Sequence, residues 1–184
     1  MPGPSACNGG VRAAPQEVTY YDYPGASRVA AMPGIGNGLV AQPYGACALE
    51  TMDAYGSLIG SPVEYLKFLL ALDGRRGTAL LSRASLHEMT ARPSIPGYEH
   101  AAVYYGLGVQ VWIVSKGRNS WHAGSQPGME ALALRNADGA SWGVVFNTRP
   151  QDQSALRRDY DHALQNALSR MRGWPSGDLF AQFL

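Results

Sequence analysis

The stretch MEALALRNADGASWGVVFN, residues 129–147, decides the fold that this sequence predicts. Residues 129–135 alternate in the way that is typical of a strand with one buried face. Asn136-Ala137-Asp138-Gly139 supplies the residues of a tight turn, and residues 141–147 then form a returning apolar strand. The stretch therefore predicts an antiparallel hairpin.

Two stretches upstream of the hairpin also predict strands. Residues 104–114, YYGLGVQVWIV, alternate with period two in their second half. Residues 116–119 are typical of a turn, and residues 120–125 form a candidate strand that leads into the hairpin. Together these segments predict an antiparallel meander of three or four strands.

Helices are predicted on both sides of this meander. The first has a capping box, because Ser61 and Glu64 stand three residues apart with a proline between them. A second, short helix begins near Ser82 and ends before Pro93, and a long amphipathic helix covers about residues 152–172. Helices, then antiparallel strands, then a helix packed on the sheet define the α+β class.

The N-terminal part of the chain has weaker patterns. Residues 1–16 form a leader rich in Pro, Gly and Ala, which we expect to be disordered. Residues 17–23 predict a short strand, and residues 24–44 predict a long ordered loop. We expect a single domain over residues 17–184.

Composition limits the classes of function. The chain has 184 residues, of which 46% are hydrophobic and 16% charged, with a net charge of +1. This balance argues against nucleic-acid binding, and no apolar window is long enough to span a membrane. No signal peptide is evident, which favours the cytoplasm weakly. Cys7 and Cys47 are expected to be free thiols, and nothing indicates a cofactor.

Several candidate sites have little support. Gly139-Ala140-Ser141-Trp142-Gly143 matches the G-x-S-x-G nucleophile elbow, but this Ser follows a hairpin turn and opens a strand. Residues 36–41 fit a loose dinucleotide-binding pattern without a surrounding βαβ unit. His87, His100 and His162 lack metal-ligand spacing, so we expect no metal site.

The segment His122-Ala123-Gly124-Ser125 is a stronger candidate. On a strand, His122 and Gly124 point to one side. A glycine beside a histidine leaves room for a ligand to approach the backbone, and an acyl substrate could lie alongside as an added strand. The alternative is an edge strand that ends in a turn at residues 126–128.

The order of these motifs resembles the serine β-lactamase / penicillin-binding protein family, and above all its esterase-like and D-aminopeptidase-like branch. The resemblance rests on YGLGVQVW, then WHAGSQPGMEALALR, a DG hairpin, SWGVVFNTR and a final helix, and it covers roughly residues 17–180. Residues 49–93 are similar to the helical segment that these enzymes carry between their second and third motifs. The resemblance implies an incomplete β-lactamase/transpeptidase-like fold with part of the helical lobe.

The resemblance also implies roles for residues. His122 would take the position of the usual Lys of the third motif and donate to the substrate or to a neighbouring hydroxyl. Ala123, Gly124 and Ser125 would bind the substrate, with the Ser125 N–H in the oxyanion hole. The family hydrolyses small acyl compounds, namely esters, amides and β-lactams, and its members are often exported.

The departures from the family pattern are as informative as the match. No Ser in this chain is followed three residues later by Lys, and no Tyr or Ser by Asn two residues later, so both the S-x-x-K and the Y-x-N motif are missing. The resemblance thus implies a C-terminal part without a nucleophile, inactive alone, that could pair with the missing N-terminal half. The alternative is a non-catalytic remnant or partner-binding module that keeps the substrate groove.

Overall fold

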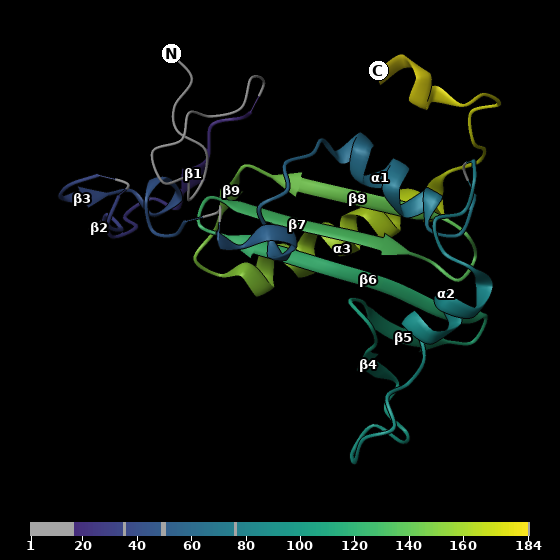
Figure 1. The fold of residues 1–184 in the computed structure, drawn as a ribbon. Coiled ribbons are helices and arrows are strands. Elements are labelled where there is room, and N and C mark those ends of the chain that lie inside the picture. Colours follow the sequence, from purple (N-terminus) through teal and green to yellow (C-terminus); the bar gives the residue numbers. More distant parts are fainter. Residues whose placement is uncertain (1–16, 35, 49–50, 76, 184) are drawn as a thin grey trace. The chain divides into compact units, whose positions relative to one another are not determined.

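The computed structural model describes residues 17–34, 36–48, 51–75 and 77–183. Figure 1 shows its helices and strands in the order β1 (Tyr21–Asp22), β2 (Val29–Ala30), β3 (Leu39–Val40), η1 (Gln42–Tyr44), η3 (Asp53–Tyr55), α1 (Pro62–Ala71), α2 (Arg83–Met89), β4 (Val103–Tyr105), β5 (Gln110–Val114), β6 (Gly117–Gln126), β7 (Met129–Arg135), β8 (Ser141–Phe146), β9 (Thr148–Arg149), α3 (Gln153–Arg170) and η4 (Leu179–Phe183).

The main sheet has five antiparallel strands in the order β4-β5-β6-β7-β8, so each strand pairs with its neighbour in sequence. This order is a meander, as the alternating pattern predicts. The α+β class is confirmed, because helices precede the sheet and the long helix α3 follows it (Figure 1). The sequence predicts three or four strands, and the sheet has five.

The β7–β8 hairpin forms where its turn residues predict it. The Asn136 N–H donates to the Ala140 carbonyl at 2.8 Å, and the Gly139 N–H donates to the Asn136 carbonyl at 3.0 Å. Gly139 has φ +101°, a conformation that favours glycine. The Asp138 side chain accepts a hydrogen bond from the Ala140 N–H at 3.0 Å and so closes the turn.

Two boundaries differ from the prediction. Residues 104–114 form a hairpin and not one strand, with Tyr105 opposite Gln110 and a turn whose Gly108 has φ +74°. The turn expected at residues 116–119 is shorter, because Gly117 already pairs with Val114 in the β5–β6 ladder. The predicted strand over residues 120–125 is confirmed inside the longer β6.

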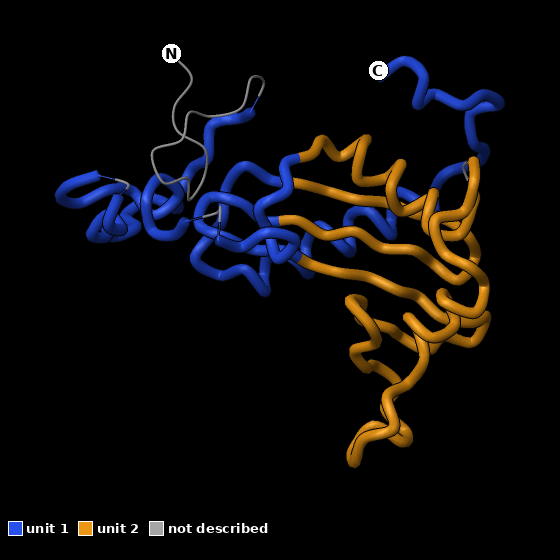
Figure 2. The backbone as a smooth tube through the Cα atoms, in the orientation of Figure 1, with its two compact units in different colours: residues 1–59, 124–130, 146–184 blue, residues 60–123, 131–145 orange. Residues whose placement is uncertain are grey.

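The chain divides into two compact units, coloured separately in Figure 2. The first unit contains residues 1–59, 124–130 and 146–184, and the second contains residues 60–123 and 131–145. The boundary crosses β6 between Ala123 and Gly124, so this strand contributes residues to both units.

The second unit holds an apolar core. Its buried hydrophobic residues come from the end of α1 and from four strands, namely Leu72, Tyr104, Val111, Leu132, Ala133, Leu134 and Trp142. Helix α1 lies against the hairpin at Gly143, where a methyl group added to the Cα atom would sit 3.7 Å from Cδ2 of Leu66. Burial of these side chains is the main stabilising contribution to the unit.

Helix α1 begins and ends as its sequence predicts. The Glu64 N–H donates to Oγ of Ser61 at 3.2 Å, and the Ser61 N–H donates to Glu64 Oε2 at 2.7 Å, which completes the capping box. Hydrogen bonding by Ser61, above all from its backbone N–H, lowers the pKa of the Glu64 carboxyl group. After the helix, Gly74 takes φ +77° and reverses the chain.

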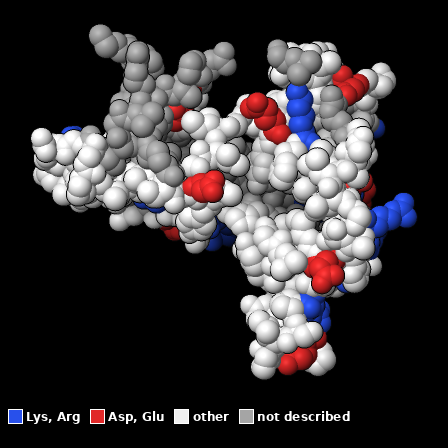
Figure 3. All heavy atoms as spheres, in the orientation of Figure 1, with Lys and Arg blue, Asp and Glu red and all other residues white. Residues whose placement is uncertain are grey.

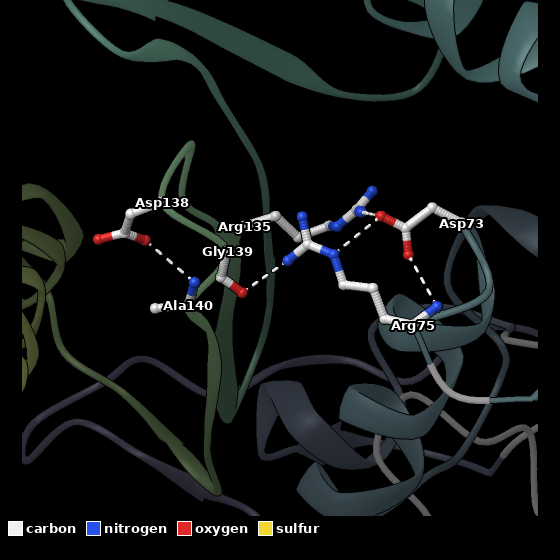
Figure 4. Close-up of polar contacts among 6 residues, drawn as sticks. All are labelled: Asp73, Arg75, Arg135, Asp138, Gly139 and Ala140. Atoms are coloured by element: carbon white, nitrogen blue, oxygen red, sulfur yellow. Dashed lines mark hydrogen bonds and ion pairs between the residues drawn. The ribbon is translucent and has the colours of Figure 1, made fainter. Parts of the chain in front are cut away.

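An ion-pair cluster joins the end of α1 to the β7–β8 hairpin (Figure 4). Asp73 pairs with Arg135 of β7 and with Nε of Arg75 at 3.0 Å. Nη1 of Arg75 also donates to the Gly139 carbonyl at 2.6 Å. The cluster therefore links segments more than sixty residues apart.

The first unit is organised around the segment after residue 16. Strand β1 pairs in parallel with β9, with Tyr21 opposite Thr148. The predicted strand over residues 17–23 is thus reduced to two residues. The predicted loop over residues 24–44 is wrong in part, because it contains the antiparallel β2–β3 pair and the turn η1. Short pairings of this kind leave no periodic signal in the sequence.

Helix α3 is present within the predicted limits, and Asp152 caps it by accepting from the Ala155 N–H at 2.9 Å. Tyr160 is buried and packs on Phe146, with ring centroids 5.3 Å apart. The buried face of this amphipathic helix is narrow, since Ala163 and Ala167 are exposed.

Two expectations concern the leader and the cysteines. The expected disorder of residues 1–16, and Cys7 with it, lies outside the described residues. The expected free thiol at Cys47 is wrong, because Cys47 is disulfide-bonded. Two cysteines are too few to reveal a disulfide framework from spacing, which explains the error.

Charged side chains are sparse and scattered on the visible face in Figure 3, without a large patch of one sign. None of the helices within the described residues is long and apolar enough to cross a membrane.

Candidate functional site

The segment His122-Ala123-Gly124-Ser125 lies within β6, and β6 has a strand on each side in the sheet. The ladder with β5 ends at Trp121, however, so the alternative of an edge strand is wrong for residues 117–121, and residues 122–125 extend past β5. His122 is exposed, and the next three residues are half-buried. The backbone is held on both sides as far as Trp121, next to His122, and beyond Trp121 the side of the strand that faces away from β7 lies outside the β5 ladder.

His122 has a close polar partner in the second unit. Nε2 of its ring lies 2.9 Å from the hydroxyl of Tyr105, at the end of β4. The two rings meet edge to face, with centroids 6.1 Å apart and an angle of 72°. The resemblance implies a hydroxyl neighbour for His122, but sequence reasoning did not single out Tyr105.

The packing of the chain does not explain why residue 124 is a glycine. A methyl group built on its Cα would meet no heavy atom within 4 Å. Its backbone also does not require the left-handed conformation, unlike that of Gly128, where φ is +76°. The space beside Gly124 is open, so a ligand can approach this part of the strand.

Ser125 and Gln126 attach the end of β6 to other parts of the first unit. Oγ of Ser125 donates to Oε1 of Gln153, the first residue of α3, at 2.9 Å. Nε2 of Gln126 donates to the carbonyl of Gly56 at 3.2 Å. The Ser125 hydroxyl is thus occupied by a structural hydrogen bond and is not poised as a nucleophile.

The chain reverses immediately after β6. Pro127 and Gly128 occupy the two central positions of a turn, and φ of +76° at Gly128 is typical of type II. A methyl group on Gly128 would lie 2.7 Å from Cγ of Pro43 and 2.9 Å from Cβ of Tyr20. The turn is therefore packed against the N-terminal segment, and only glycine fits there.

A buried carboxylate follows this turn, which sequence reasoning missed. Glu130 of β7 has no exposed surface and forms an ion pair with Nε of Arg157 in α3. The hydrogen bond to Glu130 raises the pKa of Arg157. Burial, and then the charge of Glu130, raise the pKa of Tyr160 to about 12. No local sequence pattern pairs residues 27 positions apart.

The weaker candidates do not form sites. Ser141 begins β8, so the strand–turn–helix arrangement of a nucleophile elbow is not present there. His87 and His162 are exposed on helices α2 and α3, and His100 lies in the segment before β4. No group of three or more potential metal ligands occurs among the described residues.

No protein-family model matches the chain, and no curated protein or solved structure does either. The chemistry of the segment therefore rests on its own geometry. A carbonyl or carboxylate oxygen can accept hydrogen bonds from an exposed imidazole and from backbone N–H groups, and the open space at the glycine lets it approach the strand. A serine paired with a lysine three residues later does not occur in the sequence.

Proposed function

We propose that residues 17–184 are the C-terminal part of a β-lactamase-related serine hydrolase, in which residues 122–125 form one wall of the acyl site. One observation carries this proposal. Strand β6 carries His122 and the open Gly124 just past the end of its ladder with β5, and it leads through a Pro-Gly turn into the β7–β8 hairpin and then α3.

The open space at Gly124 is the most specific support for a ligand site. A glycine in a strand interior costs stability, about 0.5–1 kcal/mol relative to alanine. Neither backbone conformation nor neighbouring atoms account for that cost at this position, in contrast to Gly128. Close approach of a ligand to the strand backbone does account for it.

The residues of the segment have distinct roles in this proposal. His122 donates a hydrogen bond to an oxygen of the substrate. Ala123 and Gly124 leave a narrow strip of backbone along which an acyl group lies, and the Ser125 N–H contributes to the oxyanion hole. The substrate class is a small ester, amide or β-lactam.

The chain lacks the attacking group for this chemistry. Acyl transfer requires a nucleophile within hydrogen-bond reach of its base, and this sequence has neither S-x-x-K nor Y-x-N. In our proposal a second polypeptide segment supplies them, and the incomplete β-lactamase-like fold, with α1 and α2 as part of its helical lobe, is inactive alone. A backbone donor without a nucleophile retains only a small residual effect.

A second candidate function is a non-catalytic module that keeps the substrate-binding strand. The lack of an S-x-x-K motif in the sequence favours it. The genomic sequence beside the coding region distinguishes the two candidates. An in-frame S-x-x-K followed by Y-x-N supports the hydrolase, and a region without them supports the non-catalytic module.

Turnover assays test the role of the chain directly. We expect the purified protein to hydrolyse nitrocefin and p-nitrophenyl acetate no faster than the His122→Ala variant does. We also expect no serine to react with a fluorophosphonate probe. Turnover that disappears in His122→Ala, or stoichiometric labelling of Ser141, would contradict the proposal that the nucleophile lies outside this chain.

A further inference from the structure

The hydroxyl of Tyr105 and the imidazole of His122 form the hydrogen bond on which a further inference rests. The two residues come from β4 and β6, which β5 separates. The distance of 2.9 Å and the edge-to-face contact of the rings define one orientation of the imidazole. Both side chains are exposed, so their contact is not a consequence of core packing.

The alternation of β4 separates its two tyrosines. Tyr104 is buried, and its hydroxyl donates to the Thr90 carbonyl at 2.9 Å. Tyr105 must therefore point to the opposite face, where Val103 is also exposed. In the register of the sheet Tyr105 lines up with Gln110 and Trp121, so alternation alone does not bring it to His122. The two side chains meet at the end of β4 through their direct hydrogen bond.

The backbone beside Tyr105 is held on both sides. The Gly106 N–H donates to the Val109 carbonyl at 2.8 Å, which closes the β4–β5 turn. The Leu107 N–H donates to the carbonyl of Met89, at the end of α2, at 2.9 Å. A methyl group on Gly106 would collide with that same carbonyl. Tyr105 is consequently presented from a fixed turn, as a residue that orients another side chain requires.

We propose that Tyr105 is a positioning residue, which holds His122 through Nε2 so that Nδ1–H faces the ligand. This inference rests on the proposed function of the segment. A phenol is a better hydrogen-bond donor than a neutral imidazole N–H, so Tyr105 donates to Nε2 and the ring proton stays on Nδ1. Among the described residues Nδ1 has no hydrogen-bond partner.

The arrangement indicates the chemistry of the ligand atom. When the imidazole is neutral, Nδ1–H is a donor, and when it is protonated, Nε2–H donates to the Tyr105 oxygen while Nδ1–H remains a donor. Nδ1 therefore offers a hydrogen in both protonation states. It matches an acceptor without a hydrogen of its own, which is a carbonyl or carboxylate oxygen of an acyl compound.

The tautomer of His122 tests the pairing without any ligand. Long-range ¹H–¹⁵N correlation spectra of histidine-labelled protein at pH 8 report which ring nitrogen carries the proton, and His122→Gln assigns the signal. We expect the Nδ1–H form in the wild type and a return to the Nε2–H form, which free histidine favours, in Tyr105→Phe. Tyr55→Phe, which changes a tyrosine that is 85% exposed and lies in the other unit, is the matched control.

Two results in these spectra would overturn the inference. One is an Nε2–H tautomer in the wild type, a measurement that does not depend on whether any variant folds. The other is an unchanged Nδ1–H tautomer in a folded Tyr105→Phe protein.

Binding of benzylpenicillin separates this inference from the proposed function. We expect Tyr105→Phe to weaken binding about fivefold, the effect of one hydrogen bond. If the Nδ1–H tautomer depends on Tyr105 but the wild type does not bind benzylpenicillin, the positioning role is supported and the proposed function is contradicted. Equal affinities of wild type and Tyr105→Phe contradict the positioning role alone.

Discussion

Replacement of Gly128 by alanine tests whether the turn after β6 is fixed by packing against the N-terminal segment. With φ at +76°, an alanine at this position is strained by about 1–2 kcal/mol. Its methyl group would also lie 2.7 Å from Cγ of Pro43 and 2.9 Å from Cβ of Tyr20. Overpacking of this kind costs about 1–3 kcal/mol, so we expect a total loss of about 2–5 kcal/mol.

Two other glycines separate these contributions. Gly25 has φ +81° and open space around it, so Gly25→Ala should lose only the conformational part, about 1–2 kcal/mol. Gly124→Ala meets neither problem and should raise stability by about 0.5–1 kcal/mol, the cost of a glycine inside a strand. Urea unfolding followed by tryptophan fluorescence measures all three variants. A Gly128→Ala protein as stable as Gly25→Ala would refute the packing of the turn.

Further predictions concern the buried polar groups of the first unit. Arg157→Leu leaves the carboxylate of Glu130 buried without a cation and should lower the free energy of unfolding by about 3–5 kcal/mol. The double variant with Glu130→Leu should recover much of that loss in the same urea experiment. If the double variant recovers no stability, the pairing is contradicted. The pKa of Tyr160, raised to about 12, means that the unfolded state loses this proton first, so stability falls as pH rises from 10 towards 12. In thermal melts over that range Tyr160→Phe should lose less stability than the wild type, and parallel losses would show that Tyr160 does not contribute.

The sequence predicts the parts of this fold that local chemistry controls. The capping box at Ser61 and the turn residues 136–139 act within a few positions of chain, and both form as expected. The hairpin within residues 104–114 was missed because its turn has no Asn-Gly or Asp-Gly pair, although Gly108 supplies the positive φ. The two glycines at positions 106 and 108 were the signal that could have indicated this turn.

The candidate site was predictable only in part for the same reason. His122 and Gly124 stand out because their strand is flanked by turn residues and carries small neighbours. Tyr105 reaches His122 only after the register of three strands is set, and no pattern in the sequence gives that register. The pair of Glu130 and Arg157 likewise depends on where α3 meets β7 within the first unit. Long-range contacts of this kind become visible only with the tertiary structure.

The most direct test of the acyl site follows the backbone amides of β6 by ¹H–¹⁵N correlation spectroscopy during titration with benzylpenicillin at millimolar concentrations. For the proposed acyl site we expect saturable shifts centred on residues 122–125, intact ligand throughout, and loss of the shifts in Gly124→Val, which fills the open space beside the strand. Saturable shifts centred elsewhere, or none in the wild type, would contradict the proposed site.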